Sequence, residues 1–387
     1  MMKNLISKRV QAIPPSGIRK FFDIASQMED VISLGVGEPD FDTPWHIREE
    51  GIYSLEKGKT FYTSNAGLPE LREEISKTTY RKYGLSYDPL SQVIVTVGGS
   101  EGIDLALRAI LEPGDEVLIP EPCFVSYKPC TVLAGGTPVT IPLKEENNFK
   151  LTKEQLEEYI TEKTKILFLA FPSNPTGAIM EKEELEAIAK VIIEKDIFVI
   201  SDEIYAELTY GKKHTSIASI DGMKERTLII NGFSKAYAMT GWRLGYAMGP
   251  SELIKAMTII HQYAIMCTPT ASQYAAIEAI KNGDEDIEKM RTAYNQRRNL
   301  LVSRFRNMGL ECFEPEGAFY LFPSIQKTNM TADEFCTELL KEQKVAVIPG
   351  TAFGDSGEGF IRCSYAYSMN DLKKALDKIE IFIKNRI

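Results

Sequence analysis

The stretch Asn231–Tyr246 holds two cations and a hydroxyl whose spacing suits a phosphorylated aldehyde. Lys235 follows Ser234 after the apolar run Thr227–Ile230, and Arg243 lies eight residues further on. A lysine beside apolar runs is expected to be buried, and burial lowers its pKa. A lysine that forms a Schiff base requires such a lowered pKa. A serine hydroxyl and a guanidinium both suit a phosphate. The stretch therefore predicts a covalent bond to an aldehyde at one end and a phosphate contact at the other.

Pyridoxal phosphate fits that description. The alternative is an ordinary solvated lysine, which a Ser-Lys dipeptide alone does not exclude. The rest of the chain favours the cofactor, because it supplies the other groups that such a site requires.

A second phosphate contact is predicted where the apolar run Val93–Val97 turns into a helix. The turn is rich in glycine and includes Gly99, Ser100 and Glu101. A glycine-rich turn from a strand into a helix presents backbone N–H groups and the positive end of the helix dipole to an anion.

The elements that must position these groups are strands alternating with helices. Besides Val93–Val97, the apolar runs are Glu116–Ile119, Pro138–Ile141, Ile166–Phe171, Ile197–Ile200, Thr227–Ile230 and Leu244–Met248. They predict an α/β fold with three layers, in which helices cover both faces of a mainly parallel sheet of about seven strands. Ligands of such sheets bind beyond the carboxyl ends of the strands.

Polar and aromatic residues follow several of these runs. Asp202 could hold a pyridine nitrogen protonated, Asn174 and Tyr205 could donate to a ring oxygen, and Phe124 could stack on the ring. Each also has a structural interpretation: Asp202 as a helix N-cap, Asn174 as a turn former, Phe124 as core. Their joint occurrence at strand ends favours the site.

Three further candidates rest on weaker patterns. Gly37 in Ile32–Pro44 would let the backbone approach a ligand, although it also suits a plain loop. Tyr62 is a lone aromatic. Arg362 is either a surface charge or a buried fork for a substrate carboxylate. The Gly-Lys-Thr after Gly51 is not a P-loop, because six residues separate its glycines where the P-loop has four.

Composition excludes several classes of function. The net charge of −9 over 387 residues argues against nucleic acid and anionic membranes as partners, and no apolar run is long enough to span a membrane. The six cysteines form no C-x-x-C motif, which favours reduced thiols in the cytoplasm and no metal site. The three histidines, His46, His214 and His261, are interpreted as structural or surface residues.

The length predicts a large domain and a smaller one. We expect an N-terminal arm and helix (residues 1–45, the helix over Ser16–Asp30) that packs with the small domain. A large cofactor-binding domain (46–283) and a smaller α/β C-terminal domain (284–387) follow. Short apolar runs at Ala318–Phe322, Val345–Pro349 and Phe360–Tyr365 belong to the smaller domain.

With these motifs in order, the chain resembles the class I/II aminotransferases of the fold-type I pyridoxal phosphate enzymes, most closely the archaeal and bacterial aromatic amino acid aminotransferases. The resemblance covers essentially the whole chain. It rests on Ser-Asn-Pro-Thr-Gly at 173–177, Ser-Asp-Glu-Ile-Tyr at 201–205, Ser-Lys at 234–235, Thr-Gly-Trp-Arg-Leu-Gly at 240–245 and Arg-Cys-Ser-Tyr-Ala at 362–366.

The resemblance implies an aminotransferase that moves an amino group from an L-amino acid to a 2-oxo acid such as 2-oxoglutarate. In it, Lys235 would bind the cofactor and then carry the substrate proton, Asp202 would keep the ring nitrogen positive, and Arg362 would hold the substrate carboxylate. Asn174 and the backbone of Gly37 would assist Arg362.

The resemblance also implies an obligate homodimer, in which Tyr62 reaches the phosphate in the partner subunit. An aromatic or broad neutral amino donor is favoured, because some relatives that accept aspartate carry a lysine where this chain has Ser100. Aspartate or alanine aminotransferases and a β-lyase on the same fold remain as alternatives.

Overall fold

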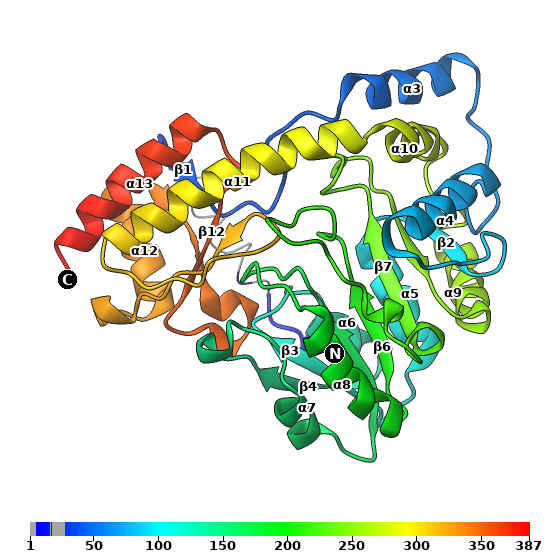
Figure 1. Cartoon of the computed structure of the whole chain (residues 1–387), viewed down its shortest axis with the longest axis horizontal. Helices are drawn as coiled ribbons and strands as arrows, with labels where there is room; N and C mark the ends of the chain where they lie inside the picture. Colours follow the sequence, from blue (N-terminus) through cyan, green and yellow to red (C-terminus); the bar gives the residue numbers. More distant parts are fainter. Residues whose placement is uncertain (1–4, 16, 18–27) are drawn as a thin grey trace.

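The computed structural model describes residues 5–15, 17 and 28–387 (Figure 1). The helix predicted over Ser16–Asp30 falls almost entirely outside these ranges.

All seven predicted apolar runs form strands of one sheet, which has the order β2-β8-β7-β6-β5-β3-β4. The strands are β2 (Val93–Thr96), β3 (Glu116–Glu121), β4 (Thr137–Pro142), β5 (Thr164–Leu169), β6 (Phe198–Asp202), β7 (Thr227–Gly232) and β8 (Gly245–Met248). Only β8 runs against its neighbours, so the sheet is mainly parallel, as the sequence predicts. The carboxyl ends of the other strands therefore meet at one edge.

Helices cover both faces of this sheet, because the strands are apolar on both sides. On one face, α5 (Gly99–Ile110), α6 (Tyr127–Ala134) and α9 (Ser251–Ala264) pack on side chains such as Ile94 and Ile166. The other face is covered by α4 (Pro69–Tyr83), α7 (Lys153–Tyr159), α8 (Lys182–Glu194) and α10 (Thr270–Asn282). The apolar stripe of α8 that runs from Leu185 to Ile192 is buried.

The C-terminal part is built on long helices and short strands. The 24-residue α11 (Asp284–Asn307) runs across the molecule toward α12 (Ala332–Gln343) and α13 (Met369–Lys384) (Figure 1). A three-stranded antiparallel sheet joins β11 (Ile348–Pro349), β12 (Ile361–Ser364) and β9 (Tyr320–Leu321). In addition, β1 (Ile32–Ser33) pairs in parallel with β10 (Val345–Ala346), so the segment before Gly35 lies against this part.

The remaining described elements are short or peripheral. They are α1 (Lys8–Gln11), α3 (Trp45–Glu56) and the 3₁₀ helices η1 (Glu145–Asn147), η2 (Ile217–Ser219), η3 (Lys224–Arg226), η4 (Gln326–Thr328), η5 (Gly350–Phe353) and η6 (Asp355–Gly357). Within residues 5–15, 17 and 28–387, no helix is long and apolar enough to cross a membrane. The same residues contain no group of three or more His, Cys, Asp or Glu side chains arranged for a metal ion.

Candidate active site

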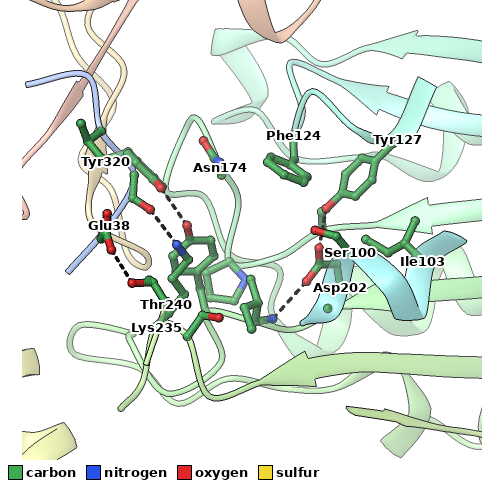
Figure 2. Close-up of a pocket in the computed structure, with 18 of the residues that line it drawn as sticks. Glu38, Ser100, Ile103, Phe124, Tyr127, Asn174, Asp202, Lys235, Thr240 and Tyr320 are labelled. Atoms are coloured by element: carbon green, nitrogen blue, oxygen red, sulfur yellow. Dashed lines mark hydrogen bonds between the residues drawn. The ribbon is translucent and has the colours of Figure 1, made fainter. Parts of the chain in front are cut away.

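A cavity of about 480 Å³ opens at the carboxyl edge of the seven-stranded sheet (Figure 2). Its walls come from the ends of β5, β6 and β7, the start of α5, the loop after β1, and the strands β9 and β12. The lining residues are Gly35, Val36, Gly37, Glu38, Gly99, Ser100, Ile103, Phe124, Tyr127, Ala170, Pro172, Asn174, Asp202, Ile204, Tyr205, Ser234, Lys235, Thr240, Gly241, Arg243, Tyr320 and Arg362.

Lys235 projects into this cavity from the loop that joins β7 to β8. Its Nζ donates a hydrogen bond of 2.6 Å to the carbonyl oxygen of Gly37. Burial lowers the pKa of Lys235 from 10.5 to about 8, with the nearby Glu38 carboxylate opposing the shift and the Arg362 guanidinium adding to it. The neutral amine is therefore accessible near physiological pH.

The same loop brings Ser234 and Arg243 opposite the first turn of α5. Gly98, which precedes that turn, has a φ of +76°, and a Cβ there would lie 2.6 Å from Nη2 of Arg243. Only glycine therefore lets the guanidinium approach the turn so closely. Gly99 and Ser100 at the start of α5 line the cavity together with Ser234 and Arg243, so a helix N-terminus, a hydroxyl and a guanidinium are all available to a phosphate.

Asp202, at the end of β6, forms the floor of the cavity. One carboxylate oxygen accepts a 2.8 Å hydrogen bond from the hydroxyl of Tyr127 and the other accepts the backbone N–H of Ile204. Figure 2 shows the phenol of Tyr127 pointing toward Asp202. Burial raises the pKa of Asp202, and the Tyr127 hydrogen bond acts against that rise. A buried carboxylate in this position suits a cationic partner.

Two tyrosines meet beside Lys235. The hydroxyl groups of Tyr205 and Tyr320 lie 2.8 Å apart, and burial raises the pKa values of both phenols. A Cβ on residue 37 would overlap the Tyr320 hydroxyl, so glycine is required there. The sequence predicts that the backbone of Gly37 lies close to a ligand; in the structure it lies close to the side chain of Tyr320.

Arg362 is 2% exposed and has no carboxylate partner among the described residues. Its Nη1 donates to the Asn174 side-chain oxygen at 2.8 Å, and its Nη2 donates to the carbonyl oxygen of Gly35 at 2.6 Å. Its guanidinium carbon lies 4.4 Å from the centre of the Tyr320 ring and 4.6 Å from that of Phe353. Burial lowers the pKa of Arg362, and Nε has no hydrogen-bond partner within the described part of the chain. A buried cation held only by neutral groups calls for an anion.

Comparison with known proteins assigns this arrangement to a family. Residues 29–379 match the family described as aminotransferase class I and II. YugH of Bacillus subtilis (strain 168), which bears an aminotransferase name, is 55% identical over 382 residues, covering 99% of each chain. The aspartate aminotransferase of Pyrococcus abyssi (strain GE5 / Orsay) is 48% identical over 384 residues, covering 98% of this chain and 99% of its own.

The chain belongs to the class I and II aminotransferases. Solved structures agree: the aromatic aminotransferase from Pyrococcus horikoshii OT3 is 46% identical, with a TM-score of 0.91, and the match covers 95% of this chain and 99% of the other. The fold is therefore fold-type I, and the protein is an enzyme that uses pyridoxal phosphate to move an amino group between an amino acid and a 2-oxo acid.

The residues around the cavity of this aminotransferase fit pyridoxal phosphate. A lysine with a lowered pKa suits the aldehyde, a buried carboxylate suits the ring nitrogen, and Arg243 beside a glycine turn suits the phosphate. Phe124 lines the wall between Asn174 and Tyr127, where a ring face could pack.

The structure brings most of the predicted site residues of this aminotransferase together, but not all. Those that line the cavity are Gly37, Gly99, Ser100, Phe124, Asn174, Asp202, Tyr205, Ser234, Lys235, Arg243 and Arg362. The Glu101 side chain does not line it and instead binds the backbone N–H of Val97 and the ring of His261. Tyr62 is 80% exposed and lies outside the cavity of its own chain.

Sequence reasoning missed two tyrosines that line the cavity. Tyr127 lies three residues after Phe124, at the start of α6, so its nearness to a strand end was a usable signal. Tyr320 lies in β9, and nothing in its local sequence connects it with Tyr205, which is 115 residues away. The expectation that the histidines are structural or surface residues agrees with their positions: His214 and His261 are buried beside carboxylates, and His46 is partly exposed.

Proposed function

We propose that the predicted site residues of this aminotransferase bind the cofactor as follows. Lys235 binds it covalently, and Asp202 pairs with its ring nitrogen. Its phosphate is held by Ser234, Arg243 and the turn Gly99–Glu101. Tyr205 and Asn174 bind its ring oxygen, and Phe124 packs on the ring. When bound, the cofactor supplies an electron-accepting ring next to the substrate Cα.

Lys235 then acts as the base and acid of the reaction. Once a substrate amine had taken its place on the cofactor, the free amine of Lys235 would take the proton from the substrate Cα and deliver it to C4′, the former aldehyde carbon of the cofactor. Support comes from the lowered pKa, because an amine that titrates near 8 can both accept and donate a proton close to neutral pH.

Arg362 holds the α-carboxylate of the substrate, with help from Asn174 and the backbone of Gly37. The single observation that carries this proposal is the buried guanidinium with only neutral partners, Asn174 and Gly35. A substrate carboxylate would give it the charge-assisted pair that the protein alone does not provide.

The preferred amino donor is aromatic or neutral, with 2-oxoglutarate or a similar 2-oxo acid as acceptor. Among the described residues that line the cavity, the cations are Lys235, Arg243 and Arg362. If these serve the aldehyde, the phosphate and the α-carboxylate, no lining cation of the described chain remains for a second carboxylate. Ser100 lines the cavity and is neutral, whereas a lysine at this position would bind a second carboxylate.

The test is the half-reaction of the purified enzyme with phenylalanine, tyrosine, alanine, aspartate and cystathionine, followed by absorbance and by oxo-acid release. We expect one equivalent of oxo acid and the fastest conversion with an aromatic or neutral donor. Ser100→Lys should raise the rate with aspartate relative to phenylalanine, whereas the control Ser100→Ala should not.

Aspartate as the fastest donor would contradict the proposed specificity and favour the aspartate aminotransferase alternative. The name of the Pyrococcus abyssi relative, an aspartate aminotransferase, supports that alternative. Alanine as the fastest donor would select the alanine alternative. Release of ammonia and pyruvate from cystathionine would favour the β-lyase.

We further propose a homodimer in which Tyr62 of one chain reaches the phosphate site of the other. Its hydroxyl is free to do so, because Tyr62 is 80% exposed, as is the adjacent Phe61. The division into residues 1–45, 46–283 and 284–387 stays a prediction, which the pairing of β1 with β10 supports. A cytoplasmic location is favoured by the six free cysteines.

A further inference from the structure

A buried histidine lies behind the turn that carries Gly99 and Ser100, outside the cavity. His261 on α9 is fully buried, and its Nδ1 lies 2.8 Å from Oε1 of Glu101. Its Nε2 has no hydrogen-bond partner within the described part of the chain. None of the roles proposed above uses this histidine, although it contacts the first turn of α5 directly.

Glu101 connects His261 to the turn. Its second carboxylate oxygen accepts the backbone N–H of Val97, the last residue before the glycines. The Thr96 hydroxyl also fixes the turn, because it donates to the carbonyl oxygen of Gly98 at 2.9 Å. The conformation from Val97 to Glu101 is therefore fixed by side chains that lie behind it and leave its front open to the cavity.

The direction of the His261 bond follows from the chemistry of its partner. An ionised carboxylate can only accept hydrogen bonds, so Nδ1 of His261 is the donor. The bond joins α9 to α5, which also share an apolar contact surface that includes Ile103 and Met257. Loss of this donor would leave one Glu101 oxygen without its partner in a largely buried position, at the helix end where the phosphate is proposed to bind.

We propose that His261 is a positioning residue for the cofactor phosphate: through Glu101 it holds the turn Val97–Ser100 in the shape that presents its backbone N–H groups to that phosphate. This inference rests on the proposed phosphate-binding role of the turn. It also explains how a carboxylate can lie in the first turn of α5, because two donors hold it behind the turn and away from the cavity.

The test compares pyridoxal phosphate with pyridoxal, which lacks the phosphate. The full-length enzyme is freed of cofactor, and each compound is titrated back while the absorbance of the lysine-bound form is recorded. His261→Leu removes the donor. His261→Asn is the matched control, because its amide nitrogen occupies the position of Nδ1 and keeps the bond to Glu101. Thermal unfolding of each cofactor-free variant is measured in parallel.

We expect His261→Leu to raise the dissociation constant of pyridoxal phosphate by about tenfold, the scale of one hydrogen bond to a charged group. The same change should alter the constant for pyridoxal by less than about twofold, and His261→Asn should resemble the wild type with both compounds. Phosphorus NMR of the reloaded enzyme should show an altered phosphate signal in His261→Leu alone.

Equal weakening of both compounds by His261→Leu would overturn the proposal, since it would indicate a general packing defect. Unchanged binding of both would overturn it as well. If His261→Leu does not fold, His261→Gln takes its place, because its amide nitrogen falls at the position of Nε2 and not of Nδ1. Equal weakening of both compounds in that variant, or of neither, would likewise overturn the proposal. A wild-type enzyme that forms no lysine-bound species with pyridoxal phosphate would instead contradict the proposed function of Lys235.

Discussion

At the scale of single residues, burial decides what the charged groups of the cavity can do. Lys235 donates to the carbonyl oxygen of Gly37 and not to a carboxylate, so desolvation outweighs the opposing charge of Glu38 and its pKa falls to about 8. Arg362 keeps its charge in a similar setting, because a guanidinium loses its proton only far above neutral pH. The two cations therefore differ in function: one titrates and the other does not.

The first prediction concerns the pH dependence of Lys235. In the cofactor-free enzyme, the rate of pyridoxal phosphate capture should rise with pH, with a midpoint near 8 instead of near 10.5. Because the folded state binds fewer protons than the unfolded state between these values, the contribution of Lys235 to the free energy of unfolding should also rise over that interval. Stopped-flow absorbance measures the capture rate. A midpoint at or above 10 would show that Lys235 is solvated.

Arg362→Lys tests the carboxylate contact. We expect kcat/KM for phenylalanine to fall about hundredfold, because a lysine cannot form bidentate hydrogen bonds with the substrate carboxylate. Phenethylamine, which lacks the carboxylate, is the internal control, and its already slow half-reaction should change by less than about threefold. An equal loss with both compounds would mean that Arg362 supports the structure of the cavity and does not bind the carboxylate.

Tyr127→Phe tests the support of Asp202. The Tyr127 hydroxyl acts against the burial-induced rise in the pKa of Asp202, so its removal should raise that pKa further. We expect kcat to fall about tenfold and the acid limb of the pH profile of kcat/KM to move to higher pH. Tyr80→Phe, an exposed tyrosine 65% accessible to solvent, is the control. A fall in kcat without movement of the acid limb would contradict this account.

At the scale of elements, the turn between β2 and α5 depends on a conformation that only glycine supplies easily. Gly98 and Gly84 both have positive φ values, +76° and +70°, but only Gly84 is in the left-handed helical region, because its ψ is 9° whereas that of Gly98 is 166°. A Cβ on Gly84 meets open space, whereas one on Gly98 would meet the guanidinium of Arg243. Gly84→Ala therefore shows the effect of a positive φ alone, without contact with the phosphate site.

Gly98→Ala should weaken pyridoxal phosphate binding by at least about tenfold, because Arg243 must move away from the turn. Gly84→Ala should leave that binding unchanged and destabilise the fold by about 1 kcal/mol, whereas Gly98→Ala should destabilise it more, by up to about 3 kcal/mol. Cofactor titration and thermal unfolding of the two variants provide the comparison. Similar cofactor affinities in the two variants would refute the proposed position of Arg243.

The strands and the site residues that follow them also show which features could be predicted from the sequence and which could not. The apolar runs became strands because most of their residues are buried on both faces of the sheet, so continuous apolar character and length were sufficient, even for the partly exposed edge strand β4. Asp202 and Asn174 were found because parallel strands present their carboxyl ends at one edge. Tyr320 was not found, since it reaches Tyr205 only through the folding of a distant strand. The backward hydrogen bonds of Glu101 were missed because a turn pattern gives the place of a side chain but not its direction.

At the scale of the whole molecule, the proposed partner chain can be tested by complementation. Heterodimers are made from one chain with Lys235→Ala and another with Tyr62→Phe. If Tyr62 acts across the interface, the only site with a lysine receives an intact Tyr62, and cofactor affinity at that site should match the wild type. A weakened site would mean that Tyr62 acts within its own chain. Light scattering should first show a species of twice 43.4 kDa.

The single antiparallel strand of the large sheet has a consequence for how the enzyme can move. Because β8 returns beside β7, the short loop between them begins and ends at the same edge and carries both Lys235 and Arg243. Their separation is set by twelve covalently linked residues, 233–244, anchored at both ends in one sheet. Arg362 belongs to another sheet, on β12. A displacement of the three-stranded sheet would therefore move Arg362 but would leave unchanged the covalent path that joins Lys235 to Arg243.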